Sequence, residues 1–416
     1  MEEWKEYKLG EIADVQTGPF GSQLHQSDYV SFGTPCIMPT NIGPQLDIKT
    51  EGIAYVKEED VKRLEKHCVK AGDIIYSRRG DIEKCAFIRK DEEGWLCGTG
   101  CLRIRIKAIE SNPHFIAYQL STKECKKWIV GNAVGTTMLN LNTGILKELP
   151  LLLPDKSTQD SVVSVLKSLD DKIEVNRRIN ENLEQQAQAL FKSWFVDFEP
   201  FKDGGFVESE LGMIPKGWRV VSLDEMTSKF GTGLNPRKNF KLGEGNNYYV
   251  TIKNMGNNRV YLDDKCDKVT DDAIEKINKR SKLQEGDLLF SGIGTIGRVA
   301  LVTQTPTNWN TSESVFNMHP TQNISSEFLY ILLLSDVFQQ YVKIHAQGGV
   351  QQGIRMASLK EYRMAIPEDS LLRKFDDIVM PIISRIKNND NQSDSLATLR
   401  DTLLPRLMSG KLNITI

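Results

Sequence analysis

The sequence predicts an α+β protein in which two similar globular domains, β-rich with helices, are separated by two long antiparallel coiled-coil helices. Two observations carry this prediction. The chain repeats itself once, and each repeat ends in a long apolar stripe at helical spacing. Of the 416 residues, 40% are hydrophobic and 26% are charged, which is typical of a folded globular protein. No run of 18 apolar residues occurs, so we expect no membrane span.

The repeat is visible in collinear pairs of residues. The segment Gly72–Ser77 matches Gly286–Ser291 at an offset of 214 residues. Further pairs at offsets of 214 or 213 are spread along both copies: Trp4 and Trp218, Leu9 and Leu223, Trp95 and Trp309, Phe115 and Phe328, Gly135 and Gly348, and Pro154 and Pro367. A collinear series of this length indicates a tandem duplication with pseudo-two-fold symmetry.

Each copy begins with a globular part. Short strands are predicted at 73–77 and 102–106, and an amphipathic helix over Pro113–Val130 has its counterpart over Ser326–Lys343. A closing strand ends before a proline in each copy, at 149–153 and 363–366. The expected boundaries are 1–155 for the first domain, 156–200 for a central helix, 201–215 for a linker, 216–367 for the second domain, and 368–416 for a second helix and tail.

The long helices carry a heptad seam with matching interruptions. Apolar residues step by three and four over 166–194, and again 213 residues later over 379–407. Asn176 and Asn180 interrupt the first stripe, and Asn389 and Ser393 interrupt the second at the same register. Polar seam residues weaken a coiled coil but fix its register and partner. A helix packed on its own domain is the alternative, and the shared interruptions favour pairing of the two helices.

An antiparallel pair of such helices would act as a ruler. The first helix is expected to span 160–198, which is 39 residues, or roughly 55–60 Å at 1.5 Å per residue. B-DNA advances about 34–36 Å per turn. Two globular domains at the ends of such a rod would lie one to one and a half DNA turns apart.

The cysteines and the N-terminus indicate a cytoplasmic chain. Seven cysteines, an odd number, favour free thiols over a disulfide framework. Cys97 and Cys101, with Cys85 nearby, have the wrong spacing for a zinc site, and no histidine completes four ligands, so no metal is expected. The first ten residues carry charges where a signal peptide needs an apolar core.

Four segments resemble the specificity subunits of type I restriction–modification systems. They are Leu399–Leu412, Ala189–Phe198, Ile214–Leu223, and the repeated Gly-Asp-Ile/Leu-Ile/Leu-Tyr/Phe-Ser motif. The resemblance covers the whole chain. It implies that each globular copy is a target-recognition domain for one half of a bipartite DNA site, and that the helices set the gap. It further implies that two methyltransferase subunits and motor-nuclease restriction subunits assemble on the chain.

The same resemblance implies a non-catalytic chain. No cofactor is expected here, and S-adenosylmethionine, ATP and Mg²⁺ are expected on the partner subunits. Gly292–Gly297 fits the dinucleotide pattern G-x-G-x-x-G, but 298–302 reads as a strand where a helix N-terminus is needed. Asp155 and Asp170–Lys172 imitate a metal-dependent nuclease motif, but the second part lies on the long helix. A methyltransferase using Gly292–Gly297 and a free-standing regulator of a bipartite operator remain alternative functions.

DNA contacts are expected where the copies align in frame but differ in chemistry. The formal net charge of -2 does not exclude DNA binding, because phosphate contacts need only a local basic face. Arg can pair with guanine and Asn or Gln with adenine; surface salt bridges, turn-capping asparagines and ordinary polar loops are the alternatives. The expected contacts are Thr40, Asn41, Ser77, Arg78, Arg79, Asn140 and Asn142 in the first copy, and Lys253, Asn254, Ser291, Arg298, Gln351, Gln352 and Arg355 in the second.

A weaker candidate loop is Pro19–Gln23, which matches 231–235 only in its glycines. Protein partners are expected at the apolar helix ends, where the residues exceed the needs of a two-helix seam. The expected docking residues are Phe191, Trp194, Phe195, Leu404, Leu407 and Met408.

Overall fold

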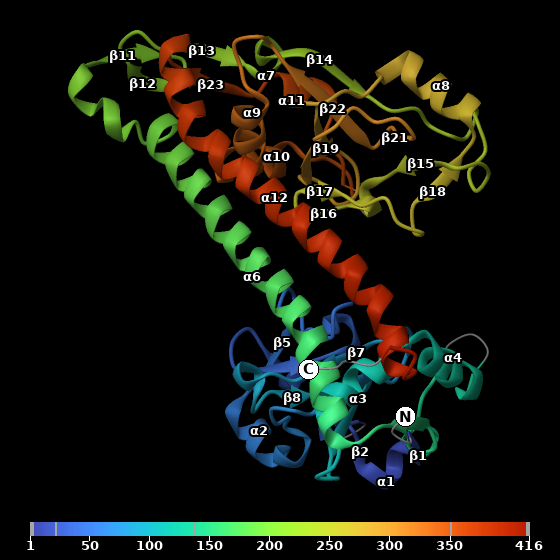
Figure 1. The fold of residues 1–416 in the computed structure, drawn as a ribbon. Helices are drawn as coiled ribbons and strands as arrows, with labels where there is room; N and C mark the ends of the chain where they lie inside the picture. Colours follow the sequence, from blue (N-terminus) through green and yellow to red (C-terminus); the bar gives the residue numbers. More distant parts are fainter. Residues whose placement is uncertain (1–3, 21–22, 136–138, 350–351, 413–416) are drawn as a thin grey trace. The chain divides into compact units, whose positions relative to one another are not determined.

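The computed structural model describes residues 4–20, 23–135, 139–349 and 352–412. Two compact units divide the chain. The first unit contains the residues up to Asn176 and those from Asn391 onward, and the second contains Arg177–Asp390. Each unit therefore holds one globular copy and one segment from each of the two long helices (Figure 1).

In the first unit, a four-stranded antiparallel sheet runs in the order β2-β9-β6-β7. These strands are Ala13–Thr17, Cys101–Ile106, Ile74–Ser77 and Cys85–Phe87. A second sheet runs β3-β5-β4-β8, with strands Tyr29–Val30, Ala54–Val56, Thr34–Ile37 and Leu96–Cys97. The closing strand β10 (Pro150–Leu153) pairs antiparallel with β1 (Lys5–Lys8). Short helices are α1 (Leu9–Ile12), α2 (Glu58–Arg63) and α5 (Thr143–Lys147).

The second unit repeats this plan. Its four-stranded sheet runs β14-β22-β19-β20, with strands Thr227–Thr232, Val315–Pro320, Leu288–Ser291 and Val299–Leu301. A three-stranded sheet runs β18-β15-β21, with strands Asp267–Val269, Asn247–Val250 and Trp309–Thr311. The strand pairs are β13–β23 (Arg219–Ser222 and Arg363–Ile366), β16–β17 (Met255–Gly256 and Arg259–Val260) and β11–β12 (Phe206–Ser209 and Gly212–Pro215). Short helices are α7 (Leu223–Met226), α8 (Asp271–Ser281) and α11 (Met356–Lys360).

The prediction of a single amphipathic helix in each copy is wrong, because the structure has two shorter helices there. The first copy has α3 (Pro113–Leu120) and α4 (Lys123–Asn132), and the second has α9 (Ser326–Leu334) and α10 (Asp336–His345). At the breaks, the Thr122 hydroxyl accepts a hydrogen bond from the Cys125 amide, and the Ser335 hydroxyl accepts one from the Phe338 amide. A side-chain N-cap starts a new helix at the same place in both copies.

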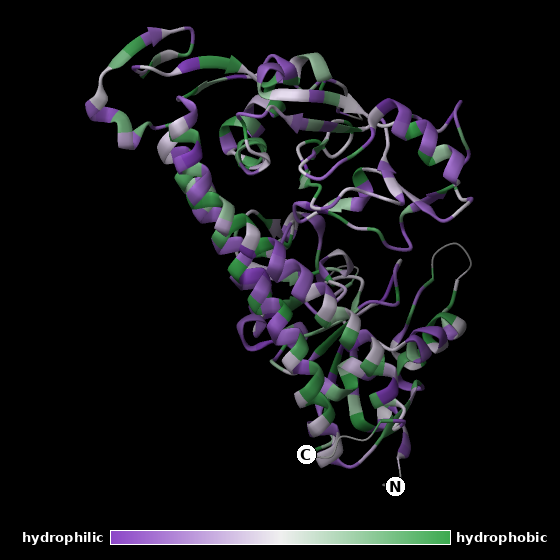
Figure 2. Ribbon diagram, turned by 45° about the horizontal axis from the view of Figure 1, so that its top comes forward, coloured by the Kyte–Doolittle hydropathy of each residue, from purple (hydrophilic) through white to green (hydrophobic). Residues whose placement is uncertain are grey.

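The two long helices are each 40 residues long, α6 over Lys156–Phe195 and α12 over Asp369–Met408. The first begins before the expected residue 160, since the Asp155 carboxylate accepts hydrogen bonds from the amides of Ser157 and Thr158. It ends before residue 198, because Phe198 adopts a left-handed φ of 54°. Green and purple residues alternate along both helices in Figure 2, as expected of amphipathic helices.

The helix segments pair antiparallel within each unit. In the first unit, Asn176 donates to Gln392 at 2.9 Å, and Asp170 contacts Arg400 further along. In the second unit, the side-chain Nδ2 of Asn389 donates to the side-chain Oδ1 of Asn180 at 2.8 Å. The Nδ2 of Asn180 in turn donates to the Asp390 carboxylate at 2.9 Å. The polar interruptions of the seam therefore bond across the helix pair, and the expected coiled-coil pairing is confirmed.

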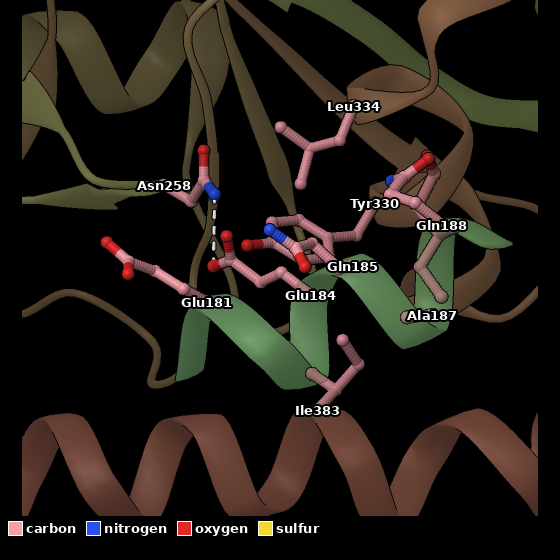
Figure 3. Close-up of a pocket in the computed structure, with 10 residues that line it drawn as sticks. Glu181, Glu184, Gln185, Ala187, Gln188, Asn258, Tyr330, Leu334 and Ile383 are labelled. Carbon is pink, nitrogen blue, oxygen red and sulfur yellow. Dashed lines mark hydrogen bonds between the residues drawn. The ribbon is translucent and has the colours of Figure 1, made fainter. Parts of the chain in front are cut away.

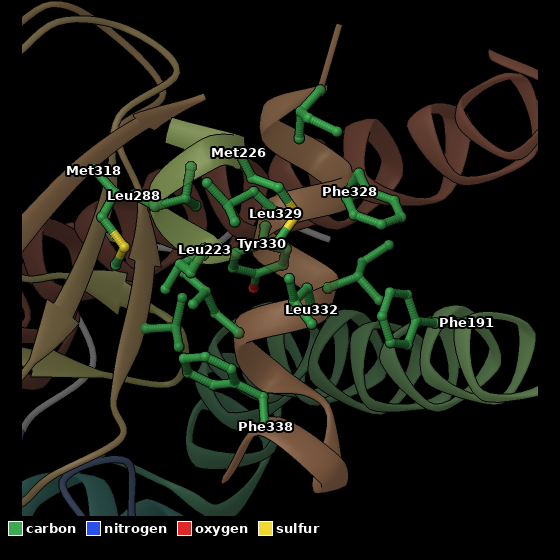
Figure 4. Packing of buried hydrophobic residues seen from close by; sticks show 14 of the residues in the cluster. Phe191, Leu223, Met226, Leu288, Met318, Phe328, Leu329, Tyr330, Leu332 and Phe338 are labelled. Carbon is green, nitrogen blue, oxygen red and sulfur yellow. The ribbon is translucent and has the colours of Figure 1, made fainter. Parts of the chain in front are cut away.

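Each globular copy builds its core around its own helix segments. In the second unit, the α9 residues Phe328–Leu333 are buried in one core cluster with Phe191 and Phe375 of the long helices. Figure 4 shows Phe328, Leu332 and Phe191 in this core. In the first unit, Phe115 and Tyr118 of α3 occupy the corresponding core with Leu166 and Leu407. The long helices are thus part of each folded copy.

The cysteines are free, and six of the seven are buried. Burial raises the pKa of the Cys85 thiol to about 12, so this thiol stays protonated at neutral pH. Within the described ranges, no group of three or more His, Cys, Asp or Glu side chains is arranged to hold a metal ion. None of the helices in these ranges is both long and apolar enough to cross a membrane.

Candidate nucleic-acid interface

In the first unit, the candidate surface begins at the hairpin between β6 and β7. The Ser77 hydroxyl is buried and donates to the carbonyl of Arg79, which closes the turn. The Arg78 amide donates to the Gly100 carbonyl at 2.8 Å, and the Arg78 carbonyl accepts from the Leu141 amide at 2.9 Å. The hairpin is therefore clamped between two loops that are distant from it in sequence.

The loop between α4 and α5, described at residues 133–135 and 139–142, lies beside this hairpin. Asn140 forms isolated β-bridges with both Arg79 and Val134. Phe20, which is 56% exposed, approaches the Arg78 guanidinium, whose carbon lies 6.0 Å from the ring centroid. Candidates from three separate sequence regions thus lie together on one surface, and Phe20 comes from the weaker candidate loop Pro19–Gln23.

The second unit builds the same backbone arrangement. The Gly292 amide donates to the Ser314 carbonyl at 2.9 Å, and the Gly292 carbonyl accepts from the Ile354 amide at 2.9 Å. Gln347 and Gly353 exchange two hydrogen bonds of 2.8 Å, as Val134 and Asn140 do in the first unit at 3.1 and 2.8 Å. These bonds match those of the first unit at offsets of 214 and 213 residues.

The side chains on the two matched frameworks differ. Arg78 and Arg79 in the first unit correspond to Gly292 and Ile293 in the second. A Cβ atom at position 292 would lie 2.3 Å from the Phe316 ring, so any larger residue there would have to displace that ring. The two copies therefore share a loop scaffold and present different chemistry on it.

Six of the expected contacts have side chains that form hydrogen bonds within their own copy. Ser77 and Ser291 are fully buried, and the Ser291 hydroxyl accepts from the Arg298 amide at 2.8 Å and donates to Thr295. The Arg298 guanidinium donates to the carbonyls of Ile252 and Met255. Asn142 is exposed, and its side-chain oxygen caps α5 by accepting from the Ile145 amide.

The remaining two of the six are the paired asparagines. Asn41 and Asn254 are 3% and 5% exposed. The Asn41 side chain accepts from the Met38 amide and donates to the Lys49 carbonyl. The Asn254 side chain accepts from the amide and hydroxyl of Thr251. Turn capping, the alternative reading of these residues, is the role that the structure gives them.

Six other expected contacts keep accessible side chains. Thr40, Arg79, Lys253, Gln352 and Arg355 are exposed, and Arg78 is half-buried. Asn140 is also half-buried, although its side-chain oxygen and the Arg78 Nε are enclosed without a hydrogen-bond partner in the described part of the chain. Gln351 lies outside the described residues. The accessible set is basic and polar, which suits groove and phosphate contacts.

The hairpin containing Gly292–Gly297 joins two antiparallel strands, because β19 and β20 pair directly. A helix N-terminus is therefore absent at this loop, and the nucleotide interpretation fails there on geometry. Asp170 of the nuclease-like motif accepts hydrogen bonds from Tyr118 and Arg400 instead. Both segments that resemble catalytic motifs therefore have structural roles, one as a hairpin turn and the other as part of a hydrogen-bonded helix contact.

Four of the six expected docking residues at the helix ends are buried in globular cores and do not form a free apolar surface. Phe191 and Phe195 are 1% and 4% exposed in the core of the second unit. Leu407 and Met408 are 1% and 6% exposed in the core of the first. The other two residues, Trp194 and Leu404, are half-buried and pack against the same cores. The helix ends carry surplus apolar residues because they complete the globular cores.

Comparisons with known proteins agree with a two-copy recognition protein. The family model described as type I restriction modification DNA specificity domain matches residues 1–185 and 215–393. The type I restriction enzyme HindI specificity subunit of Haemophilus influenzae is 26% identical over 99% of this chain and 100% of its own length. The MjaIX specificity subunit of Methanocaldococcus jannaschii is 26% identical over 99% and 94%.

A solved structure shows the same fold. The S subunit of a type I restriction–modification system from M. genitalium superposes with a TM-score of 0.54 at 16% identity, and the match covers 100% of this chain and 97% of that one. The fold class is thus that of a two-domain specificity subunit. The chain belongs to the type I restriction modification DNA specificity domain family, and it is a non-catalytic specificity subunit.

Proposed function

We propose that this chain recognises a bipartite DNA site, with one half-site read by each globular copy and a fixed gap set by the long helices. The observation that carries the proposal is the duplicated loop scaffold. The same backbone bonds hold Arg78 between Gly100 and Leu141 and hold Gly292 between Ser314 and Ile354. A common scaffold with different side chains is what two readers of different half-sites require.

The proposed DNA contacts are the accessible residues of these two scaffolds. In the first copy they are Thr40, Arg78, Arg79 and Asn140, and in the second Lys253, Gln352 and Arg355. Arg79 and Arg355 supply positive charge in different copies. Long-range attraction from the chain as a whole is weak, because its net charge is -2.

We further propose that the chain is the scaffold of a cytoplasmic complex. Two methyltransferase subunits bind the two copies, one each, and motor-nuclease restriction subunits join them. S-adenosylmethionine, ATP and Mg²⁺ belong to those partners. The duplication supports two equivalent docking positions, since each copy presents the same elements and the same pair of helix segments.

The experiment is single-molecule sequencing of DNA methylation in cells that carry this chain and its methyltransferase. A split motif with a fixed gap is the expected result. Exchanging the loop segments 77–79 and 134–141 for those of a relative should change one half-site and leave the other intact. Methylation on one continuous short site would refute the two-reader proposal, and absent methylation with retained operator binding would favour a regulator.

A further inference from the structure

A pocket of about 300 Å³ opens beside α6 in the second unit (Figure 3). Glu181, Glu184 and Ala187 of α6, Tyr330 of α9 and Ile383 of α12 line this pocket. The pocket is lined by two carboxylates and by several apolar side chains. The Glu181 carboxylate is paired with Arg177, so the acid that defines the pocket is Glu184.

The duplicated first unit fills the corresponding position with an arginine. At the offset of 213 residues, Ala187 corresponds to Arg400 and Ile383 corresponds to Asp170. Arg400 is half-buried and donates to Asp170 at 2.8 Å, and the Tyr118 hydroxyl donates to the same carboxylate at 2.5 Å. Ile331, the counterpart of Tyr118, also lines the pocket. The second unit has therefore exchanged this arginine, acid and tyrosine for smaller or apolar residues, and a pocket remains in their place.

Two polar groups that line the pocket can take a further hydrogen-bond partner. The Glu184 carboxylate accepts one hydrogen bond, from the side-chain Nδ2 of Asn258 at 3.1 Å, and it has no ion pair among the described residues. Burial, together with the nearby carboxylates of Asp390 and Glu181, raises the pKa of Glu184. Tyr330 is 5% exposed, and its hydroxyl makes no hydrogen bond within the described ranges. Figure 3 shows this hydroxyl directed towards the Glu184 carboxylate.

We propose that the pocket receives an arginine side chain of the methyltransferase subunit, so that the guanidinium pairs with Glu184 and donates a hydrogen bond to the Tyr330 hydroxyl. The inference rests on the proposed assembly with a methyltransferase. A guanidinium fits on three grounds: the charge complements Glu184, the volume accommodates the group, and Arg400 occupies the equivalent place in the first unit. The pocket makes the two docking positions unequal, since only the second copy leaves this place open.

The test measures assembly of the full chain with its co-expressed methyltransferase subunit, by light scattering after size exclusion and by titration. Glu184→Gln keeps the shape of the side chain and removes its charge, and we expect at least tenfold weaker binding of one methyltransferase. Ala187→Arg supplies an internal arginine, as in the first unit, and should block the same position. Glu275→Gln removes one exposed acid from α8 of the same unit and is the matched control, expected to assemble normally.

The outcomes separate this inference from the proposed function. If the unaltered chain does not bind the methyltransferase, the proposed function fails. If the unaltered chain binds two copies and both Glu184→Gln and Ala187→Arg assemble equally well, the pocket is not a docking site and the inference is overturned. Should Ala187→Arg fail to fold in circular dichroism, Tyr330→Phe with Glu184→Gln decides the question, since a bound arginine requires both variants to weaken assembly.

Discussion

The Arg400 Nη1 atom lies 2.8 Å from the Asp170 Oδ1 atom, and this contact joins α12 to α6 inside the first unit. The two side chains are 12% and 16% exposed. Tyr118 of α3 donates to the same carboxylate, so the globular copy and both helix segments meet at one acid.

Arg400→Ala should lower the free energy of unfolding by about 3–5 kcal/mol, because it leaves the Asp170 carboxylate enclosed without its cation. Urea denaturation of the full chain measures this change. Lys62→Ala, which breaks the exposed pair with Glu58, is the control and should cost less than about 1 kcal/mol. Equal effects of the two variants would contradict a structural role for the Asp170–Arg400 pair.

The asparagine pair of the second unit should fix helix register. Asn389→Ala removes the donor to Asn180. It should lower the free energy of unfolding by about 1–3 kcal/mol, because the buried side-chain oxygen of Asn180 loses this hydrogen bond. The double variant Asn180→Leu with Asn389→Leu should recover stability but lose register specificity. Denaturation measures the first effect, and sequencing of the methylated sites measures whether the gap stays uniform. A uniform gap in the double variant would show that other contacts set the register.

His114 should make the first unit sensitive to acid. It stacks on Phe87 at 4.0 Å and on Tyr118 at 5.0 Å. Burial, followed by the charges of Lys167 and Arg89, lowers the pKa of His114 to about 4 from its ordinary 6.5. The stability that this depressed pKa contributes is fully present above pH 6.5 and is lost as the pH falls towards 4.

The loss of unfolding free energy between pH 6.5 and pH 4 amounts to about 3 kcal/mol. In His114→Phe, the fall in unfolding free energy between pH 7 and pH 4.5 should be smaller by a comparable amount. Denaturant unfolding of both proteins across that range measures the difference. Parallel pH profiles would show that His114 is not the acid-sensitive group.

Arg79→Ala and Arg355→Ala should act on different half-sites. Each removes an exposed cation from one loop scaffold. A base contact should cost about 1–3 kcal/mol and relax specificity at one position, whereas a phosphate contact should weaken all sequences evenly and reduce the salt dependence. Binding of the assembled complex to variant sites at several salt concentrations distinguishes these cases. Relaxation of the same half-site by both variants would contradict the two-reader proposal.

Phe195→Ala should behave as a core mutation. The Phe195 ring lies 4.8 Å from Phe375 and 5.1 Å from Phe328 by centroid. Truncation should cost about 3–5 kcal/mol of stability. A docking residue would instead lose the methyltransferase without loss of stability. Thermal unfolding of the chain alone therefore tests the placement of the helix ends within the core.

The sequence could predict the repeated architecture because periodicity and duplication are local or collinear signals. The stripe of Leu166 and its successors predicted a long helix, and the matching Asn176 and Asn389 predicted a paired seam. The strands near Gly72–Ser77 and Gly286–Ser291 were equally predictable, since a Gly-Asp turn precedes a buried apolar run in each copy. The breaks at Thr122 and Ser335 escaped prediction, because one side-chain cap outweighs a continuing apolar stripe.

The residues of the candidate DNA interface could not be identified from the spacing of polar and apolar residues along the sequence. Asn41 and Arg79 look alike as polar loop residues, yet the first is enclosed by its own turn and the second is exposed. Phe195 and Met408 look like surplus apolar residues, yet they complete two cores. Which polar group reaches solvent, and which apolar group finds a partner, depends on contacts between residues far apart in sequence.

The sequence by itself determined the duplication, the long amphipathic helices and the family to which the chain belongs. Only the tertiary structure decided that matched backbone hydrogen bonds hold Arg78 and Gly292 in two loop scaffolds, and that Ala187 lines a pocket where Arg400 fills the equivalent place. The physical reason is that helix and strand patterns follow from spacing along the chain. Exposure, charge pairing and cavities follow from packing, which is fixed only when distant segments meet.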